Sequence, residues 1–280
     1  MERDGELLAR LPFMIKRRFG LTALTQPPLT QFLGPWLSPR AGKYATELTR
    51  QKELMLRLIA QLPRCDLCRM QFAPEVTNWL PFYWAGFTAM LSCTYRIPDL
   101  SDENALWAEI DSVARNEIRK AMKKVVVRTD LGIDASLELQ EKTYARHGWI
   151  MPAHDLYYRM DEACRARGCC QNFVAEDARG RHHASYYIVW DDRCAYAVGG
   201  GMNHDLARGG AGTLVRWQAV KFARTITKAF DFVGSTDERV ERAFRRLGGQ
   251  QTICLSVSKL NRRARVLSAA REFALALTRG

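Results

Sequence analysis

Hydrophobic positions recur along this chain with two different periods, and each period predicts its own kind of element. Spacings of three and four residues predict helices, whereas short apolar runs bounded by turn residues predict strands. In the first half, the spacing predicts a helix over 44–62, closed by Pro63, and a strand over 93–97. A turn-rich stretch over 26–40, which contains four prolines, precedes that helix.

The second half has a more regular order of elements. An apolar stripe predicts one helix over 101–121, and the β-branched run at 125–129 predicts a strand after it. Two helices, an antiparallel meander of three strands, a helix, a strand, a charged helix and a last strand follow. The pattern places these elements near 137–148, 155–168, 171–175, 183–190, 194–199, 211–228, 229–233, 238–248 and 252–258.

The stretch from Ala229 to Gly249 predicts a buried strand that runs straight into the start of the charged helix. Gly234 permits a turn there, and Ser235 supplies N-cap chemistry. Backbone N–H groups at such a helix start can hold a phosphate or a developing oxyanion. The junction is therefore a predicted anion site with Ser235 among its contacts.

The segment 76–95 contains no charged residue and is about as long as a bilayer-spanning helix. Its polar residues and its central Pro81 favour a bent segment buried in protein, so we predict no stable membrane insertion. Aromatic ring faces can also line a ligand site. We take as candidates for substrate binding Trp79, Tyr83, Trp84 and, from a later strand, Tyr196. Core packing is the alternative explanation for each of these rings.

Composition narrows the class of protein. The chain has 280 residues, of which 47% are hydrophobic, which is enough for one large or two medium cores. A net charge of +12 favours polyanionic partners such as RNA, a nucleotide-bearing cofactor or anionic lipid. Eight cysteines behind an N-terminus with no signal-like pattern predict reduced thiols and a cytoplasmic location. Cys65 and Cys68 form one CxxC pair without a second, so we predict no metal site.

Several motifs in a fixed order resemble a family of FemAB-like GNAT acyltransferases. The motifs are PPLTQFLGPW at 27–36, NWLPFYWAGF at 78–87, TYRI at 94–97, RKA at 119–121, FDFVGS at 230–235 and FRRLGG at 244–249. The resemblance covers nearly the whole chain. It implies an α/β (α+β) fold of two GNAT-like halves, with mixed, mostly antiparallel sheets flanked by helices. The implied parts are a degenerate N-terminal half at 1–100, a linking helix at 101–124, a C-terminal acyltransferase domain at 125–258 and a basic amphipathic helix at 259–280.

The resemblance also implies where an acyl donor binds. In a GNAT site, glycines after the third meander strand let the backbone approach the pyrophosphate of acetyl-CoA or another acyl-CoA. Arg208, Gly210 and Gly212 occupy that place in this sequence, in a partial match to the family pattern. A loop that needs glycine only for its turn is the alternative. Backbone N–H groups near Val198 to Gly200 are the implied oxyanion donors, and Gly199 and Gly200 are also candidate cofactor contacts. The partial match leaves aminoacyl-tRNA open as the donor.

Acyl transfer needs a proton acceptor and positive charge beside the donor. Asp231 is the best-placed carboxylate, although a strand carboxylate between aromatic residues is often structural. His204 follows the glycine-rich strand and is the candidate base; an exposed turn histidine is the alternative. Arg245 resembles the basic residue that faces the donor phosphates in Fem transferases, and Arg246 takes that role if the register shifts by one. A solvated helix face is the alternative for both arginines.

From these observations we predict an acyltransferase that moves an acyl group from acyl-CoA to an amine or a hydroxyl. The acceptor is a small or cell-envelope-related molecule, and attack is direct in a ternary complex. The first alternative is an aminoacyl-tRNA-dependent transferase that forms an amide, which the charge of +12 favours. The second alternative is a noncatalytic binding protein that keeps the fold.

Overall fold

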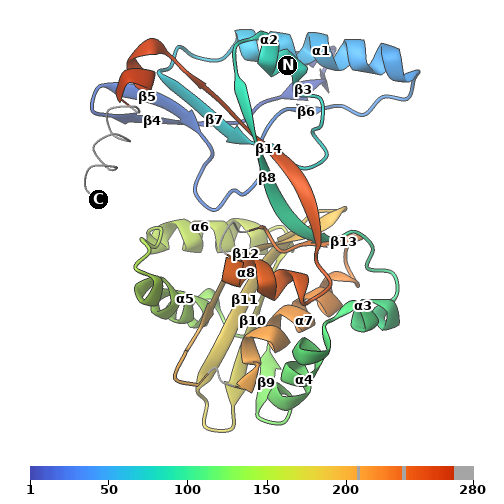
Figure 1. Ribbon diagram of the computed structural model, residues 1–280, viewed down its shortest axis with the longest axis vertical. Coiled ribbons are helices and arrows are strands. Elements are labelled where there is room, and N and C mark those ends of the chain that lie inside the picture. The colour runs from blue at the N-terminus through green and yellow to red at the C-terminus, as the bar shows by residue number, and fades with distance from the viewer. Residues whose placement is uncertain (207–208, 235–237, 268–280) are drawn as a thin grey trace. The chain divides into compact units, whose positions relative to one another are not determined.

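The computed structural model describes residues 1–206, 209–234 and 238–267 of the chain (Figure 1). These residues form two compact units: residues 1–92 with the described part from 253 onward, and residues 93–252. The strands β8 (Thr88–Ile97) and β14 (Gln250–Leu260) contribute residues to both units. The predicted domain boundaries at residues 100, 124 and 258 stay a prediction.

In its described part, the first unit is a mixed sheet with two helices ahead of β8 and a helical stretch at 262–267 after β14. Its strands follow the order β4, β5, β7, β14 and β8, with β4 at Met14–Arg18, β5 at Leu21–Thr25 and β7 at Leu67–Gln71. The predicted helix near 44–62 is confirmed as α1 (Tyr44–Ala60), and the aromatic segment forms the short α2 (Leu80–Trp84) ahead of β8. Two small ribbons pair β1 (Glu2–Arg3) with β2 (Glu6–Leu7) and β3 (Ala9–Arg10) with β6 (Trp36–Leu37).

The buried side chains of the first unit cluster around α1, α2 and the sheet. They include Leu24, Met55, Met70, Phe72, Phe82, Phe87 and Val257. Phe82 packs edge-on against Phe72 and Phe87, with ring centroids 5.0 Å and 5.2 Å away. Core packing therefore explains why the 76–95 segment carries apolar residues such as Phe82 and Phe87.

The second unit has the strand order β8, β13, β12, β11, β10 and β9. The predicted meander of three strands is confirmed, because β10 (Cys170–Asp177), β11 (His182–Trp190) and β12 (Cys194–Met202) pair antiparallel in sequence order. The predicted strand before them is β9 (Val125–Arg128), which pairs antiparallel with β10. β13 (Ala229–Asp231) joins β12 in parallel and β8 antiparallel. Helices α5 (Ile133–His147) and α6 (His154–Arg165) lie on one side of this sheet, and α7 (Ala211–Ala223) lies on the other (Figure 1).

The single helix predicted over 101–121 is wrong, because the structure has two helices there. α3 (Glu103–Glu109) and α4 (Ser112–Ala121) are separated by Ile110 in an extended conformation. The Asp111 carboxylate accepts hydrogen bonds from the backbone N–H groups of Val113, at 2.9 Å, and Ala114, at 3.2 Å. A side chain that caps the second helix so well starts a new helix instead of continuing the first.

The last two elements are α8 (Glu238–Arg245) and the strand β14. Lys259 and Leu260, predicted as the start of a C-terminal helix, are the last residues of β14. Most of the predicted helix at 259–280 lies outside the described residues, as do Arg208 and Ser235. The core of the second unit lies between the sheet and α7, with Phe173, Tyr186, Ile188, Trp217, Phe230 and Phe244 among its members.

Candidate functional site

The two parallel strands of the second unit diverge soon after they meet. β12 pairs with β13 only from Cys194 opposite Ala229 to Tyr196 opposite Asp231. β13 ends at Asp231, whereas β12 continues to Met202. In the described part of the chain, the edge of β12 beyond Tyr196 is therefore not used for pairing with β13.

A β-bulge lies at this divergence. Along the ladder between β11 and β12, Tyr187 pairs with Gly199 and Ile188 pairs with Ala197, which leaves Val198 as an extra residue. A bulge disrupts the ladder locally and re-aims the main chain, and bulges are common next to active sites. The bulge falls where the sequence predicted oxyanion donors, from Val198 to Gly200.

The glycines of β12 make room for neighbouring elements. A Cβ on Gly199 would come within 2.9 Å of the Gln140 side chain, and a Cβ on Gly201 would collide with the backbone of Leu139 on α5. On the other face, a Cβ on Gly200 would come within 2.9 Å of the Tyr186 ring. Close packing thus accounts for the absence of side chains at Gly199 and Gly200, and their contact with a cofactor stays a prediction.

The glycines at the start of α7 also serve packing. Gly210 has a positive φ of 83°. It lies against α4, where a Cβ added to it would be 2.5 Å from the Glu117 carbonyl oxygen. A Cβ on Gly212 would be 2.5 Å from the Met202 sulfur. Both glycines therefore bring the first turn of α7 against α4 and β12.

A carboxylate lies at this first turn of α7. Thr213 donates its hydroxyl to Glu117 at 2.7 Å, and the guanidinium of Arg246 lies 3.1 Å from the other Glu117 oxygen. Arg246 also forms an ion pair with Asp111 at 3.3 Å. This network ties the residue after α8 to α4 and α7, and it neutralises Glu117 locally.

A cavity of about 230 Å³ lies beside the same turn, lined by residues that include Lys124, His183 and Gly209. His183 contacts the Asp177 carboxylate at 3.0 Å. Hydrogen bonds from Arg181 and then from His183 hold the pKa of Asp177 well below its usual range. Arg181 is ion-paired with Asp177 at 2.7 Å, and Asp205 lines the cavity together with Lys124, so its lining carries charges of both signs.

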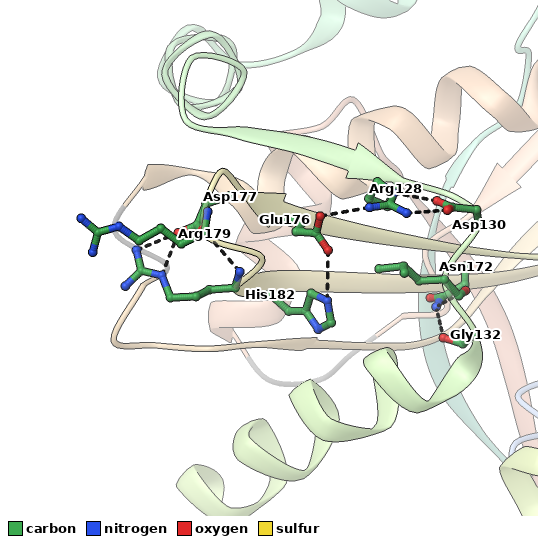
Figure 2. Close-up of polar contacts among 10 residues, drawn as sticks. Arg128, Asp130, Gly132, Asn172, Glu176, Asp177, Arg179 and His182 are labelled. Atoms are coloured by element: carbon green, nitrogen blue, oxygen red, sulfur yellow. Dashed lines mark hydrogen bonds and ion pairs between the residues drawn. The ribbon is translucent and has the colours of Figure 1, made fainter.

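Further ion pairs order the neighbouring strands β9 and β10. Figure 2 shows Glu176 between Arg128 and His182, with contacts of 3.0 Å and 3.4 Å. The Asp177 carboxylate accepts the backbone N–H of Arg179 at 2.9 Å, which shapes the hairpin tip. These charged groups are thus paired within the protein.

Asp231 is fully buried and surrounded by donors. Its carboxylate accepts hydrogen bonds from the hydroxyl of Thr94, from Nε of Arg96 at 2.5 Å and from the N–H of Val233 at 2.7 Å. Burial raises the pKa of Asp231, and the bonds from Thr94 and Arg96 oppose that rise. The Gly234 N–H in turn donates to the Thr94 hydroxyl at 2.9 Å. This arrangement favours the structural role that the sequence left open.

The other predicted catalytic residues differ in exposure. His204 contacts the guanidinium of Arg146, and burial, Arg146 and His147 together lower the pKa of His204. Arg245 is 63% exposed and forms an ion pair with Glu241 at 2.9 Å. A lowered histidine pKa keeps the ring neutral near pH 7, which a proton acceptor requires.

The aromatic candidates fall into both units. Trp79 precedes α2 and packs edge-on against Tyr83, with centroids 5.5 Å apart. Tyr83 and Trp84 are 58% and 54% exposed, and Lys52 lies over the Trp84 ring. Tyr196 lies on β12 of the second unit, opposite Asp231. A role in substrate binding therefore stays a prediction for each of these aromatic residues.

A family profile for the acetyltransferase (GNAT) domain matches residues 112–247. These residues form a GNAT acetyltransferase domain. The match confirms the predicted resemblance and the predicted class of enzyme, an acyltransferase. The divergence of β12 and β13, the bulge and the start of α7 all lie inside this GNAT domain. No curated protein sequence matches the chain.

Solved structures resemble the chain at low sequence identity. FemX aligns with a TM-score of 0.67 and 11% identity, over 91% of this chain and 86% of that one. The C-terminal domain of an Agrobacterium fabrum protein assigned as a lysylphosphatidylglycerol synthetase gives 0.57 and 12%, over 92% and 83%. L-PGS from Bacillus licheniformis gives 0.53 and 10%, over 94% and 85%. These similarities confirm the predicted fold class.

The sequence did not single out four residues that border the GNAT domain's diverging strands. They are Glu117, Gln140, Tyr186 and Arg216. Tyr186 and Tyr187 alternate along β11, so a period of two places them on opposite faces, but it does not say which face carries a site. In the described ranges, no helix is long and apolar enough to cross a bilayer, and no cluster of His, Cys, Asp and Glu is suited to a metal ion.

We predict that Asp231→Asn lowers the free energy of unfolding by about 3 kcal/mol, because it leaves Arg96 buried without its carboxylate. Thr94→Val removes a neutral donor to Asp231 and the acceptor of the Gly234 N–H, and should cost about 1–2 kcal/mol. Urea unfolding followed by circular dichroism measures both. An Asn variant that is as stable as the wild type but inactive would instead assign Asp231 to the chemistry.

Proposed function

We propose that the protein transfers an acyl group from acyl-CoA to an amine or a hydroxyl of a small or cell-envelope-related acceptor. The observation that carries this proposal is the bulge at Val198, at the point where β12 and β13 diverge inside the GNAT domain. Main-chain N–H groups at such a position can face the carbonyl oxygen of a thioester.

The proposed reaction is a direct attack in a ternary complex. The acceptor nitrogen or oxygen attacks the acyl carbon, and negative charge develops on the carbonyl oxygen. Main-chain N–H groups near Val198 stabilise that charge without reorganising, because the sheet holds them in place. The bond from carbon to sulfur then breaks, the thiolate leaves, and His204 accepts the proton that the acceptor gives up.

The donor's phosphates are proposed to lie near the start of α7. Lys124 lines the adjoining cavity, and Arg245 presents an exposed guanidinium on α8. A nucleotide-bearing donor also suits a chain with a net charge of +12.

Aminoacyl-tRNA is the second candidate donor, and one observation favours it. Glu117, which is paired with Arg246, already accepts the Thr213 hydroxyl at the first turn of α7, so this turn offers one donor fewer to a CoA pyrophosphate. In this alternative the ester bond between the amino acid and a ribose hydroxyl breaks, and an amide forms on the acceptor. A similar fold occurs in a protein assigned as a lysylphosphatidylglycerol synthetase, which supports a lipid or envelope acceptor for either donor.

A thermal-shift screen followed by turnover assays tests the choice of donor. Acetyl-CoA, longer acyl-CoAs and aminoacyl-tRNA are added separately, because a ligand that binds only the folded state raises the melting temperature. We expect acyl-CoA to raise it and CoA thiol to be released when an amine acceptor is present. Stabilisation by charged tRNA alone would select the second candidate, and no response to any donor would favour the noncatalytic binding protein.

Arg245→Ala should weaken donor binding about fivefold, the equivalent of roughly 1 kcal/mol for an exposed charge contact. Its stability should change by less than about 0.5 kcal/mol, since the side chain is exposed and pairs only within α8. Arg246→Ala is the matched control, because loss of the Asp111 and Glu117 ion pairs should lower stability by about 1 kcal/mol. Calorimetric titration with acetyl-CoA measures affinity, and an unchanged value for Arg245→Ala would remove this residue from the site.

The rate should depend on pH through His204. Because the pKa of His204 is lowered, kcat/KM should be constant near neutral pH and should fall at a midpoint below the ordinary value of 6.5. Arg146→Gln should raise that midpoint by removing a neighbouring positive charge. His204→Ala should abolish this acidic limb and lower kcat about 100-fold. A limb that persists in His204→Ala would assign the proton to another group.

A further inference from the structure

Three cysteines lie close together where α6 ends and β10 begins. Cys164 is in the last turn of α6, Cys169 follows the helix, and Cys170 is the first residue of β10. All three are partly exposed, and the chain's eight cysteines, which all lie within the described residues, are thiols in this structure. The proposed acyl transfer makes no use of these thiols.

The way in which α6 ends brings Cys164 and Cys169 together. Gly168 has a positive φ of 60°, which lets the chain turn back over the last turn of the helix. The Cys169 N–H then donates to the Cys164 carbonyl at 3.0 Å, and the Gly168 N–H donates to the Arg165 carbonyl at 2.9 Å. These two bonds define a Schellman motif, in which the residues joined by the longer bond commonly place their side chains in contact. Here both of those residues are cysteines.

The two thiols contact each other and the same stretch of backbone. Sγ of Cys169 lies 3.5 Å from the Cys164 carbonyl oxygen, and the two thiols interact through a side-chain hydrogen bond. A disulfide forms without backbone movement only between cysteines whose side chains already point toward each other. Hydrogen-bonded thiols meet this condition.

The neighbouring cysteines are less suited to oxidation. The Cys170 thiol is engaged in a side-chain hydrogen bond with Tyr187, whose hydroxyl donates to Asp161 at 2.7 Å. Cys68 of the CxxC pair is 1% exposed, and burial raises its pKa to about 12. Because the thiolate is the reactive form, such a buried thiol reacts slowly.

We propose that Cys164 and Cys169 form a redox-active pair that a low-molecular-weight disulfide, such as oxidised glutathione, converts reversibly into an intramolecular disulfide. The Cys169 thiolate attacks one sulfur of the glutathione disulfide, the S–S bond breaks, and one glutathione thiolate leaves. The Cys164 thiolate then attacks the Cys169 sulfur of the mixed disulfide, and the second glutathione thiolate leaves. The protein loses two electrons and two protons, which reduce one glutathione disulfide to two thiols.

The order of the two attacks follows from the environment of Cys164. Burial and then the neighbouring Cys169 thiol raise the pKa of Cys164 to about 11, so Cys164 is the poorer first nucleophile. Once Cys169 is part of a mixed disulfide, it can no longer carry the negative charge that opposes ionisation of Cys164. The first step therefore makes the second step easier.

The disulfide joins α6 to the sheet covalently. The Cys169 carbonyl accepts the Trp190 N–H at 3.0 Å, and Cys170 is opposite Val189 on β11. Cys169 is thus fixed where β10 and β11 begin to pair, whereas Cys164 belongs to the helix. Oxidation therefore fixes the end of α6, which the reduced protein holds only by noncovalent contacts.

Thiol counting and peptide mapping test the pair in the full chain. The reduced protein is equilibrated with mixtures of reduced and oxidised glutathione, alkylated with a maleimide and weighed as an intact monomer. We expect the number of alkylated thiols to fall from eight to six in one step and to return to eight with dithiothreitol. Trypsin cleaves after Arg165 and Arg167, so the bridge should link the peptides 160–165 and 168–179.

Serine variants identify the second sulfur, because Cys169 and Cys170 share one tryptic peptide. Cys170→Ser is the matched control and should keep the bridge, whereas Cys169→Ser and Cys164→Ser should each lose it. A bridge that survives Cys169→Ser, a bridge between Cys65 and Cys68 in its place, or eight thiols retained in oxidised glutathione alone would overturn the pair. The wild-type count and map need no variant, so a variant that fails to fold leaves the test decisive. Each of these results leaves the proposed acyl transfer unaffected.

Discussion

The close approach of α5 to the backbone of β12 is the constraint on which the candidate site depends. Gly199 and Gly201 have no side chains where Gln140 and Leu139 lie against the strand, and the Met202 N–H donates to Thr143 of α5 at 2.9 Å. Helix α5 therefore holds β12 where its pairing with β13 has already ended. A strand held in this way can keep a bulge and an edge that no other strand covers, and these two features are what a main-chain oxyanion site needs.

Two polar networks fix the surroundings of that strand. One network, centred on the buried carboxylate of Asp231, orders the end of β13 and holds Val233 at a positive φ of 55°, which is unusual for a β-branched residue. The other, centred on Glu117, joins α4, α7 and the end of α8. In both networks, charged side chains pair with each other and thereby position the chain. These side chains lie near the site but are not available to a ligand. Strain at Val233 is consistent with a functional region, because such conformations persist only where the surrounding bonds enforce them.

The sequence predicted the fold well because the signals for its elements are local. Alternating apolar residues and turn segments gave the meander, and helical spacing gave α1, α5, α6 and α7. The break at Asp111 was missed because the apolar stripe continues across it, although an aspartate that can cap a helix was visible.

The site was less predictable from the sequence than the fold. From the sequence alone, the glycines in β12 and α7 suggest that the backbone approaches a ligand. In the structure, α5, Tyr186 and Glu117 fill the space that side chains at these positions would need. Contacts between residues more than a hundred positions apart, such as Arg246 with Glu117, leave no local pattern.

The position of Glu117 also changes how a phosphate would be recognised. A helix start attracts anions through its exposed N–H groups and its partial positive charge. Here the Glu117 carboxylate already accepts a hydrogen bond from the Thr213 hydroxyl at that helix start, and it forms an ion pair with Arg246. If a phosphate binds there as proposed, the start of α7 would offer it fewer free donors than the family pattern implies, and the side chain of Lys124 at the adjoining cavity would matter more. Side-chain cations tolerate several arrangements of phosphates, whereas a glycine-rich turn fits one, so the proposed site would be less restricted to a single nucleotide-bearing donor than a GNAT site with a full phosphate-binding loop.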